Sequence, residues 1–485
     1  MTPFGFTPPH GSDGPNGPDD GSRDGSGDHS GPEDFNEMLR AIQEQMREQF
    51  KRMGIPLEGL ENMENMQFMS PENLTAMFSN MPGMPGFGLG PQGAANDPLP
   101  LATVRETAKK FVAAHGVAPL STRDQGVVAS AYEIAEIWLN EATTFPSALS
   151  PTHASAVNRA DWVDLTIAGW HRDIAPLAQG LLEAMTDLLA QAGREQGQGM
   201  GEGEEEGSQI PLEAIGGLLR TFIGSMVATQ LGQSVGSLAS TVTGAHDAGL
   251  PILDPARPVL IPENIAAWAA DLEIPQSEVF IYHALRESAV ARLFANNPWL
   301  VSYIQSAVVE YGKGINIDID AIQRQAQEAF EKAQENMGDG AAQGDAMGFA
   351  LDSGIFTPEE SPAQKIALLK LETVLALIDG WTDEVSALAA GDRLPAIEQL
   401  RETLRRRRAS AAPAQQLFSS MLGLQVSPKL TREASAFWKK IREVKSISER
   451  DQIWSGLLPT ADDLLDPEKF LASTSIPDDL SGLAE

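Results

Sequence analysis

The stretch SEVFIYHALRESAVARLF, residues 277–294, predicts the helix around which this chain folds. Ser277 suits the N-cap of such a helix. Apolar residues fall on most of its faces, so we expect the helix to lie in the protein interior. His283, Arg286 and Glu287 nevertheless share one face. Because a buried guanidinium and a buried carboxylate are costly when unpaired, both must find partners there.

Helical spacing continues on both sides of this segment. Asn297 followed by Pro298 predicts the cap and first turn of the next helix, and Gly312 predicts its end. The segment VLIP at 259–262 is a short strand-like exception. We expect an all-α fold, in keeping with an aromatic share of 6%, which is low for a β-rich protein. Besides 277–294, the pattern predicts helices over 103–114, 121–141, 159–189, 210–243 and 298–312, with about four more over 362–470.

Composition divides the chain into four parts. Residues 1–33 are rich in Gly, Pro, Asp and Ser and are expected to be disordered, because they bury too little apolar surface to offset ordering entropy. Residues 34–98 form a Met-rich amphipathic arm and linker, suited to adaptable contacts with a partner or to loose docking. Residues 99–470 form the helical domain, with a Gly/Glu-rich loop near 193–208, and residues 471–485 form a tail.

Charge and composition narrow the function classes. The formal net charge is −32, from 35 Lys and Arg against 67 Asp and Glu, which opposes binding to phosphate backbones and to anionic membranes. The absence of cysteine excludes disulfides and thiolate zinc sites. No apolar run reaches membrane-spanning length, and the amino terminus lacks signal-peptide features. We expect a cytoplasmic protein with a protein or peptide partner and no role at nucleic acids.

A set of stretches in a fixed order carries a specific resemblance. The central one is GLPILDPARPVLIPENIAAWAADLEIPQSEVFIYHALRESAVARLFANNPWL, residues 249–300. The others are NRADWVDLTIAGW at 158–170, LGQSVGSLA at 231–239, LETVLALIDGWTDEV at 371–385, and the segment 400–438. Together they resemble a zincin-like family of zinc-dependent metalloproteases or hydrolases of high-GC Gram-positive bacteria. The resemblance implies a zincin-like helical core, a zinc cofactor and hydrolysis of peptides.

The zinc motif of the family is His-Glu-x-x-His, which places two histidine ligands on one helix face and a glutamate as general base. On this sequence the motif corresponds to residues 286–290, RESAV. The resemblance gives Glu287 the general-base position. Arg286 and Val290 stand at the two histidine positions, and neither side chain has a lone pair to offer zinc. The motif is therefore degenerate in this chain.

A rearranged metal site is one interpretation of these residues. The family's further ligand falls in LIDGW, where this chain has Asp379. His283 and Glu287 are one helical turn apart, and Asp379 or Asp383 would supply a third ligand, a set suited to catalytic zinc. The alternative is structural, with His283 a hydrogen-bonded core histidine and Glu287 paired with Arg286 or with a basic residue of another helix.

Two function classes follow from these alternatives. The first is a metal-dependent hydrolase of peptides, weakened or silenced by its replaced ligands, in which Glu287 activates water. The second is a pseudoenzyme that acts as a binding or scaffolding protein, with Arg286 and Val290 filling the metal pocket. We expect that zinc does not bind at Glu287.

Two further features are candidates for a site. His246 and Asp247, in TGAHDAGLP, are a possible metal or catalytic pair, although a turn held by aspartate hydrogen bonds is the ordinary interpretation. The run Arg405–Arg408 is the densest positive cluster. Four consecutive arginines cannot share one helix face, so phosphate binding, pairing with acids elsewhere and a family-specific internal role stay open.

Overall fold

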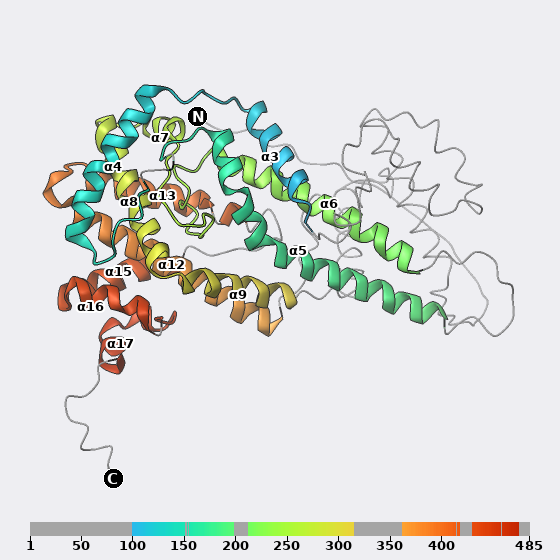
Figure 1. Cartoon of the computed structure of the whole chain (residues 1–485). Coiled ribbons are helices and arrows are strands. Elements are labelled where there is room, and N and C mark those ends of the chain that lie inside the picture. The colour runs from blue at the N-terminus through green and yellow to red at the C-terminus, as the bar shows by residue number, and fades with distance from the viewer. Residues whose placement is uncertain are drawn as a thin grey trace, which may run out of the picture. The chain divides into compact units, whose positions relative to one another are not determined.

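Helix α8 (Gln276–Asn296) lies in the interior of an all-helical domain (Figure 1). Every side chain from Tyr282 to Phe294 is buried, as expected for a helix with apolar residues on most faces. The computed structural model describes part of the chain, and all of this part belongs to one compact unit. The described residues are 99–150, 153, 155–197, 212–314, 361–413, 415–417, 429–456 and 458–474.

The helices that enclose α8 are α4, α7, α12 and α13. Helix α12 is itself buried along most of its length from Leu371 onward. It therefore forms the second interior element, and its charged residues, like those of α8, need partners from other helices. The bounds of the enclosing helices are Thr122–Ala142 for α4, Pro262–Ala269 for α7, Pro362–Ala390 for α12 and Ile397–Ala411 for α13.

A second group of helices packs beside this centre. In Figure 1, the long helices α5 and α6 run side by side, and α3 lies along α6. Gly180 of α5 and Gly312 of α9 stand where their helices cross, and a Cβ atom at either position would overlap the backbone of the other helix. The bounds are Leu101–Ala114 for α3, Arg159–Gly197 for α5, Leu212–Ala239 for α6 and Trp299–Lys313 for α9.

The carboxyl-terminal helices close the far side of α12. Trp381 of α12, Trp438 of α15 and Trp454 pack together, with ring centroids 5.4–6.3 Å apart. The carboxylate of Asp451 accepts hydrogen bonds from the Trp381 indole at 3.1 Å and from Arg450 at 2.7 Å. The elements are α15 (Lys429–Val444), α16 (Ile447–Gln452) and α17 (Pro467–Thr474), with 3₁₀ turns at Gly391–Arg393, Ile453–Ser455 and Asp463–Leu465.

Three short extended segments, 155–157, 243–245 and 259–261, pair beside α8. Leu260 forms a parallel bridge to Ala156 and an antiparallel bridge to Gly244. The Ile261 N–H donates to the Thr243 carbonyl at 2.9 Å, and the Ala245 N–H donates to the Val259 carbonyl at 3.0 Å. The strand-like VLIP stretch is thus the middle member of this pairing, while the all-α prediction is confirmed for the described residues.

Several predicted helix boundaries were wrong. Helix α8 begins at Gln276 with Pro275 at its N-cap position, so Ser277 lies inside the first turn. Pro275 has no side-chain oxygen to accept from the first-turn N–H groups, so the helix begins without a side-chain cap. Asn297 closes α8 instead of opening α9, and α9 continues past Gly312 to Lys313. Helix α5 is one element through Gly197, with Pro176 inside it.

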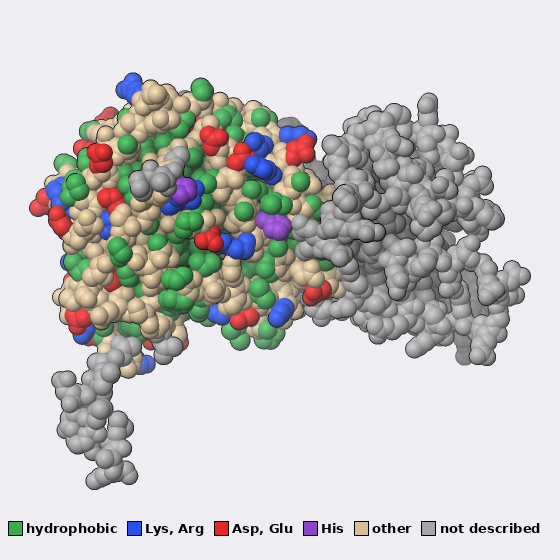
Figure 2. All heavy atoms as spheres, viewed as in Figure 1, with side chains coloured by type: hydrophobic (Ala, Val, Ile, Leu, Met, Phe, Trp, Pro, Cys, Tyr) green, Lys and Arg blue, Asp and Glu red, His purple; other side chains and the backbone are tan. Residues whose placement is uncertain are grey.

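Other predictions fall outside the described residues. The leader 1–33, the arm 34–98 and most of the 471–485 tail lie there, so the expectations for them stay predictions. None of the described helices is long and apolar enough to cross a membrane. On the face drawn in Figure 2, acidic and basic side chains are interspersed with apolar ones, and no area of one sign dominates.

Candidate functional site

The buried carboxylate of Glu287 is the centre of the first polar cluster. Its Oε1 accepts hydrogen bonds from the backbone N–H groups of Ala245 at 3.0 Å and Val259 at 3.2 Å. The backbone N–H of His246 lies 3.1 Å from Oε2, and the His246 Nδ1 lies 2.8 Å from Oε1. Because a carboxylate only accepts, Nδ1 is the donor. Glu287 therefore ties the paired segments 243–245 and 259–261 to α8.

This arrangement leaves no room around the carboxylate. A Cβ atom at Gly244 would overlap Oε2 of Glu287, so only a glycine fits where the chain passes over it. The residue as a whole is 5% exposed. The predicted pairing of Glu287 with Arg286 or another basic helix residue is wrong, since its partners are His246 and three backbone amides.

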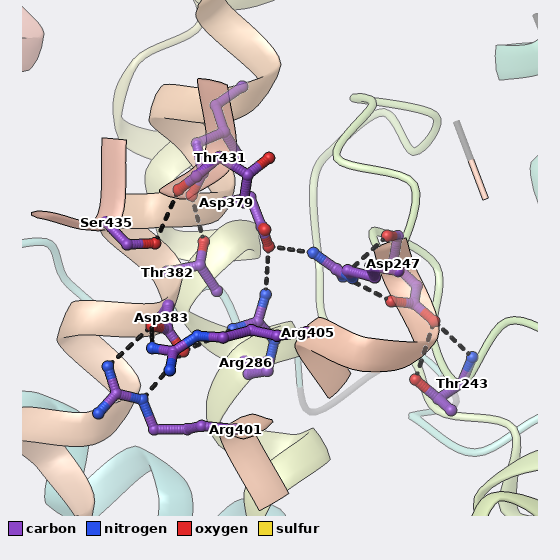
Figure 3. A network of polar contacts seen from close by, with 12 residues as sticks. Thr243, Asp247, Arg286, Asp379, Thr382, Asp383, Arg401, Arg405, Thr431 and Ser435 are labelled. Carbon is purple, nitrogen blue, oxygen red and sulfur yellow. Dashed lines mark hydrogen bonds and ion pairs between the residues drawn. The ribbon is translucent and has the colours of Figure 1, made fainter. Parts of the chain in front are cut away.

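Arg286, the residue before Glu287, points away from the paired segments and toward helix α12 (Figure 3). Its guanidinium contacts Asp379 at 2.5 Å and Asp383 at 3.7 Å. Arg408 of α13 also pairs with Asp379, and it reaches Asp247 at 2.8 Å. Asp379, which the sequence put forward as a metal ligand, thus accepts from two guanidinium groups in this structure.

Asp383 is the second anion of α12 in this cluster. Arg401 contacts both of its oxygens, at 3.1 and 2.8 Å, and Arg405 contacts one at 2.8 Å. Burial alone would raise the pKa of Asp383, but the hydrogen bonds and positive charge of Arg401, with Arg286 and Arg405, outweigh burial and lower it to about 2. The carboxylate therefore stays charged at neutral pH.

The arginine run of α13 divides between these acids and the surface. Arg408 turns inward to Asp379, and Arg405 contacts Asp383 while its side chain stays 46% exposed, whereas Arg406 pairs with Glu402 at the surface. Arg407 lies over the Trp268 ring, with 4.5 Å from its guanidinium carbon to the ring centroid. The prediction that some of these arginines fold back onto acids is confirmed. We call Asp247, Arg286, Asp379, Asp383, Arg401, Arg405 and Arg408 the ionic cluster.

Asp247 joins the cluster to the turn beside Glu287. Its Oδ2 accepts from the Thr243 N–H at 3.0 Å and from the Thr243 hydroxyl at 3.1 Å, which confirms a turn held by aspartate hydrogen bonds. Its Oδ1 accepts a hydrogen bond from the Arg408 guanidinium. Burial would raise the pKa of Asp247, but the charge of Arg408 outweighs burial and lowers it. Neighbouring residues His246 and Asp247 therefore serve different polar clusters.

His283 is a core histidine, but it lacks the predicted hydrogen bond at Nε2. Its ring makes edge contacts with Trp268 and Tyr282, at centroid distances of 4.7 and 5.4 Å. Burial lowers the pKa of His283 to about 3, and the charges of Arg286 and two α13 arginines add to this, against a smaller opposing effect of Asp247. The imidazole is neutral at pH 7.

The donors present do not fit the family's zinc site. At the motif position that the resemblance implies, Arg286 and Val290 stand in place of the histidines and offer no lone pair, and both oxygens of Glu287 already accept hydrogen bonds. Among the described residues, no three His, Asp or Glu side chains are grouped to hold a metal ion. The alternative of His283, Glu287 and Asp379 as ligands would require Glu287 and Asp379 to leave the partners they have.

The family assignment comes from comparison with known proteins. The profile of the zincin-like metallopeptidase family matches residues 101–471. This chain belongs to that family. The predicted family is confirmed at this level, and the match spans the described helices from α3 to the middle of α17.

A solved structure shares the fold. It is the crystal structure of a "putative hydrolase with a novel fold" from Chloroflexus aurantiacus, with 15% sequence identity and a TM-score of 0.51. The similarity covers 77% of this chain and 98% of the other. At this identity the likeness concerns the fold alone. No curated protein matched the chain.

We expect Glu287→Ala to lower the free energy of unfolding by about 3–5 kcal/mol, because it leaves the buried N–H groups of His246 and Val259 and the His246 Nδ1 without an acceptor. Glu287→Gln keeps one oxygen and should cost less. Urea unfolding followed by circular dichroism measures both values. The control is Glu106→Ala, which removes an exposed carboxylate paired with Lys110 and should change stability by about 0.5 kcal/mol or less. Equal effects of Glu287→Ala and Glu106→Ala would contradict the proposed role of Glu287.

We expect the free energy of unfolding to fall with decreasing pH over a range that the pKa of His283 sets. A folded pKa of about 3 lies below the ordinary value of 6.5, so the unfolded chain binds more protons between these values. This contribution is complete above about pH 6.5 and declines as the pH falls toward 3. The variant His283→Phe should reduce the slope of unfolding free energy against pH between about 6.5 and 4.5, where Asp383 remains charged. An unchanged slope would count against a neutral buried imidazole.

Proposed function

We propose that this chain is a non-hydrolytic member of its family and acts as a binding protein, with the ionic cluster in place of the zinc site. The observation that carries the proposal is the pairing of Arg286 with Asp379, which Arg408 shares. A guanidinium at the first ligand position attracts the carboxylate that would otherwise be available to a metal. The same cation would repel zinc at short range.

The position of Glu287 supports the same conclusion on chemical grounds. A general base must lie within hydrogen-bond reach of the water it deprotonates. Both oxygens of Glu287 accept from fixed backbone amides, and His246 takes a further position on Oε1. Glu287 therefore acts in our proposal as a structural acceptor, not as a base.

The test is the zinc content of the purified full chain, measured by elemental analysis before and after dialysis against zinc, together with cleavage of fluorescein-labelled casein. We expect well below about 0.1 zinc per chain and no chelator-sensitive cleavage, since structural and catalytic zinc sites bind stoichiometrically. The matched variants are His283→Ala and Asp379→Asn. About one zinc per chain that is lost in both variants, with cleavage blocked by a chelator, would establish the rearranged site and overturn the proposal.

A further inference from the structure

A hollow on the opposite side of the paired segments contains groups that the ionic cluster does not use. Its volume is about 730 Å³, within the range of ligand sites. It is lined by the first half of α4, by Ser155–Val157, by the first turns of α5 and by Arg257. No lining residue comes from α8, α12 or α13. The hollow is thus separate from the position of the family's zinc motif.

The backbone of Ala156 forms a free edge in this hollow. The pairing with Leu260 uses the Ser155 carbonyl at 2.8 Å and the Val157 N–H at 3.0 Å. In a parallel pair, the N–H and C=O of the intervening residue point away from the partner. Within the described part of the chain, these two groups of Ala156 have no hydrogen-bond partner, although the residue is 6% exposed. Nearly buried backbone groups without partners are rare and costly.

Arg257 lines the same hollow, together with His153 and Asp161, and makes no ion pair among the described residues. The side chain is half-buried, and its Nε is buried without a hydrogen bond. Burial lowers the pKa of Arg257, with no acid acting against it. Asp164, which also lines the hollow, is taken by Arg105 at 2.7 Å and Lys109 at 2.8 Å. Every other buried or half-buried arginine among the described side chains has an ion pair or hydrogen bond.

We propose that this hollow binds an extended peptide, which pairs with the backbone of Ala156 and places a carboxylate on Arg257. Strand addition to a free edge satisfies an N–H and a C=O together, and a guanidinium recognises a carboxylate with two parallel hydrogen bonds. The carboxylate belongs to the peptide's carboxyl terminus or to an acidic side chain. The inference rests on the proposed binding role, for which it names the site and the class of ligand.

The first experiment measures binding of labelled peptide pools to the full chain by fluorescence anisotropy. Three random octapeptide pools are used: free carboxyl termini without acidic residues, amidated termini without acidic residues, and amidated termini with one internal Glu. We expect the amidated pool without Glu to bind at least about tenfold more weakly than one of the others. A hydrogen bond to a charged group contributes more to binding than a neutral one, and the difference changes affinity by about tenfold. Whichever of the other two pools binds identifies the source of the carboxylate.

The variant Arg257→Gln should remove this preference, whereas Arg432→Gln should keep it. Arg432 is an exposed arginine of α15 outside the hollow, so its replacement controls for net charge. Binding of no pool by the wild type, or equal binding by wild type and Arg257→Gln, would overturn the inference. Recovered peptides should be intact by mass spectrometry. Cleaved peptides would contradict the non-hydrolytic function and leave the binding site standing.

A second variant tests the backbone edge. Ala156→Pro removes an N–H that the fold does not use, so it should weaken peptide binding about tenfold while circular dichroism and melting temperature stay near wild type. Val157→Pro is the contrast, because it removes the N–H that pairs with Leu260 and should lower the melting temperature. In the wild type, the bound pool should slow hydrogen exchange of the Ala156 amide. Unchanged exchange at Ala156 with the pool bound would place the peptide elsewhere.

Discussion

The interior position of α8 is the constraint on which the rest of the polar structure depends. Every side chain from Tyr282 to Phe294 is buried. Each charged side chain in this stretch therefore requires a partner from another element. Glu287 takes its partners from the paired segments, and Arg286 takes Asp379 from α12. These two adjacent residues thus connect α8 to opposite neighbours. The same requirement applies to Asp383 and Asp379 of α12, which pair with Arg405 and Arg408 of α13.

In a zincin of the ordinary type, a metal ion joins the motif helix to other ligands and contributes folding free energy. Here the ionic cluster makes the corresponding connections, from α8 to α12, α13 and the turn at Asp247. Such a cluster specifies an arrangement without necessarily increasing stability, because desolvation offsets much of the attraction. In our proposal, the fold of the family persists in this way without its metal.

The sequence alone predicted the all-α fold, the interior helix 277–294 and the pairing of part of the arginine run with acids elsewhere. Each of these depends on local periodicity or on residue chemistry at known spacing. The bond between His246 and Glu287 was not predictable, because 41 positions separate them and only the paired segments bring them together. The sequence TGAHDAGLP did mark His246 as a candidate site residue, but it did not indicate Glu287 as the partner. The boundary error at Ser277 arose because Pro275 ends the preceding turn whatever the capping preference of a nearby serine.

The central claim is that Arg286 and Asp379 are energetically coupled partners in the ionic cluster, and a double-mutant cycle tests it most directly. Unfolding free energies are measured in urea, with a chelator present, for wild type, Arg286→Met, Asp379→Asn and the double variant. The account predicts that each single change costs about 2 kcal/mol, because it removes a hydrogen bond between charged groups while Asp379 keeps Arg408 and Arg286 keeps Asp383. The double variant should cost less than the sum by at least about 1 kcal/mol. Additive costs, or single variants as stable as wild type, would contradict it.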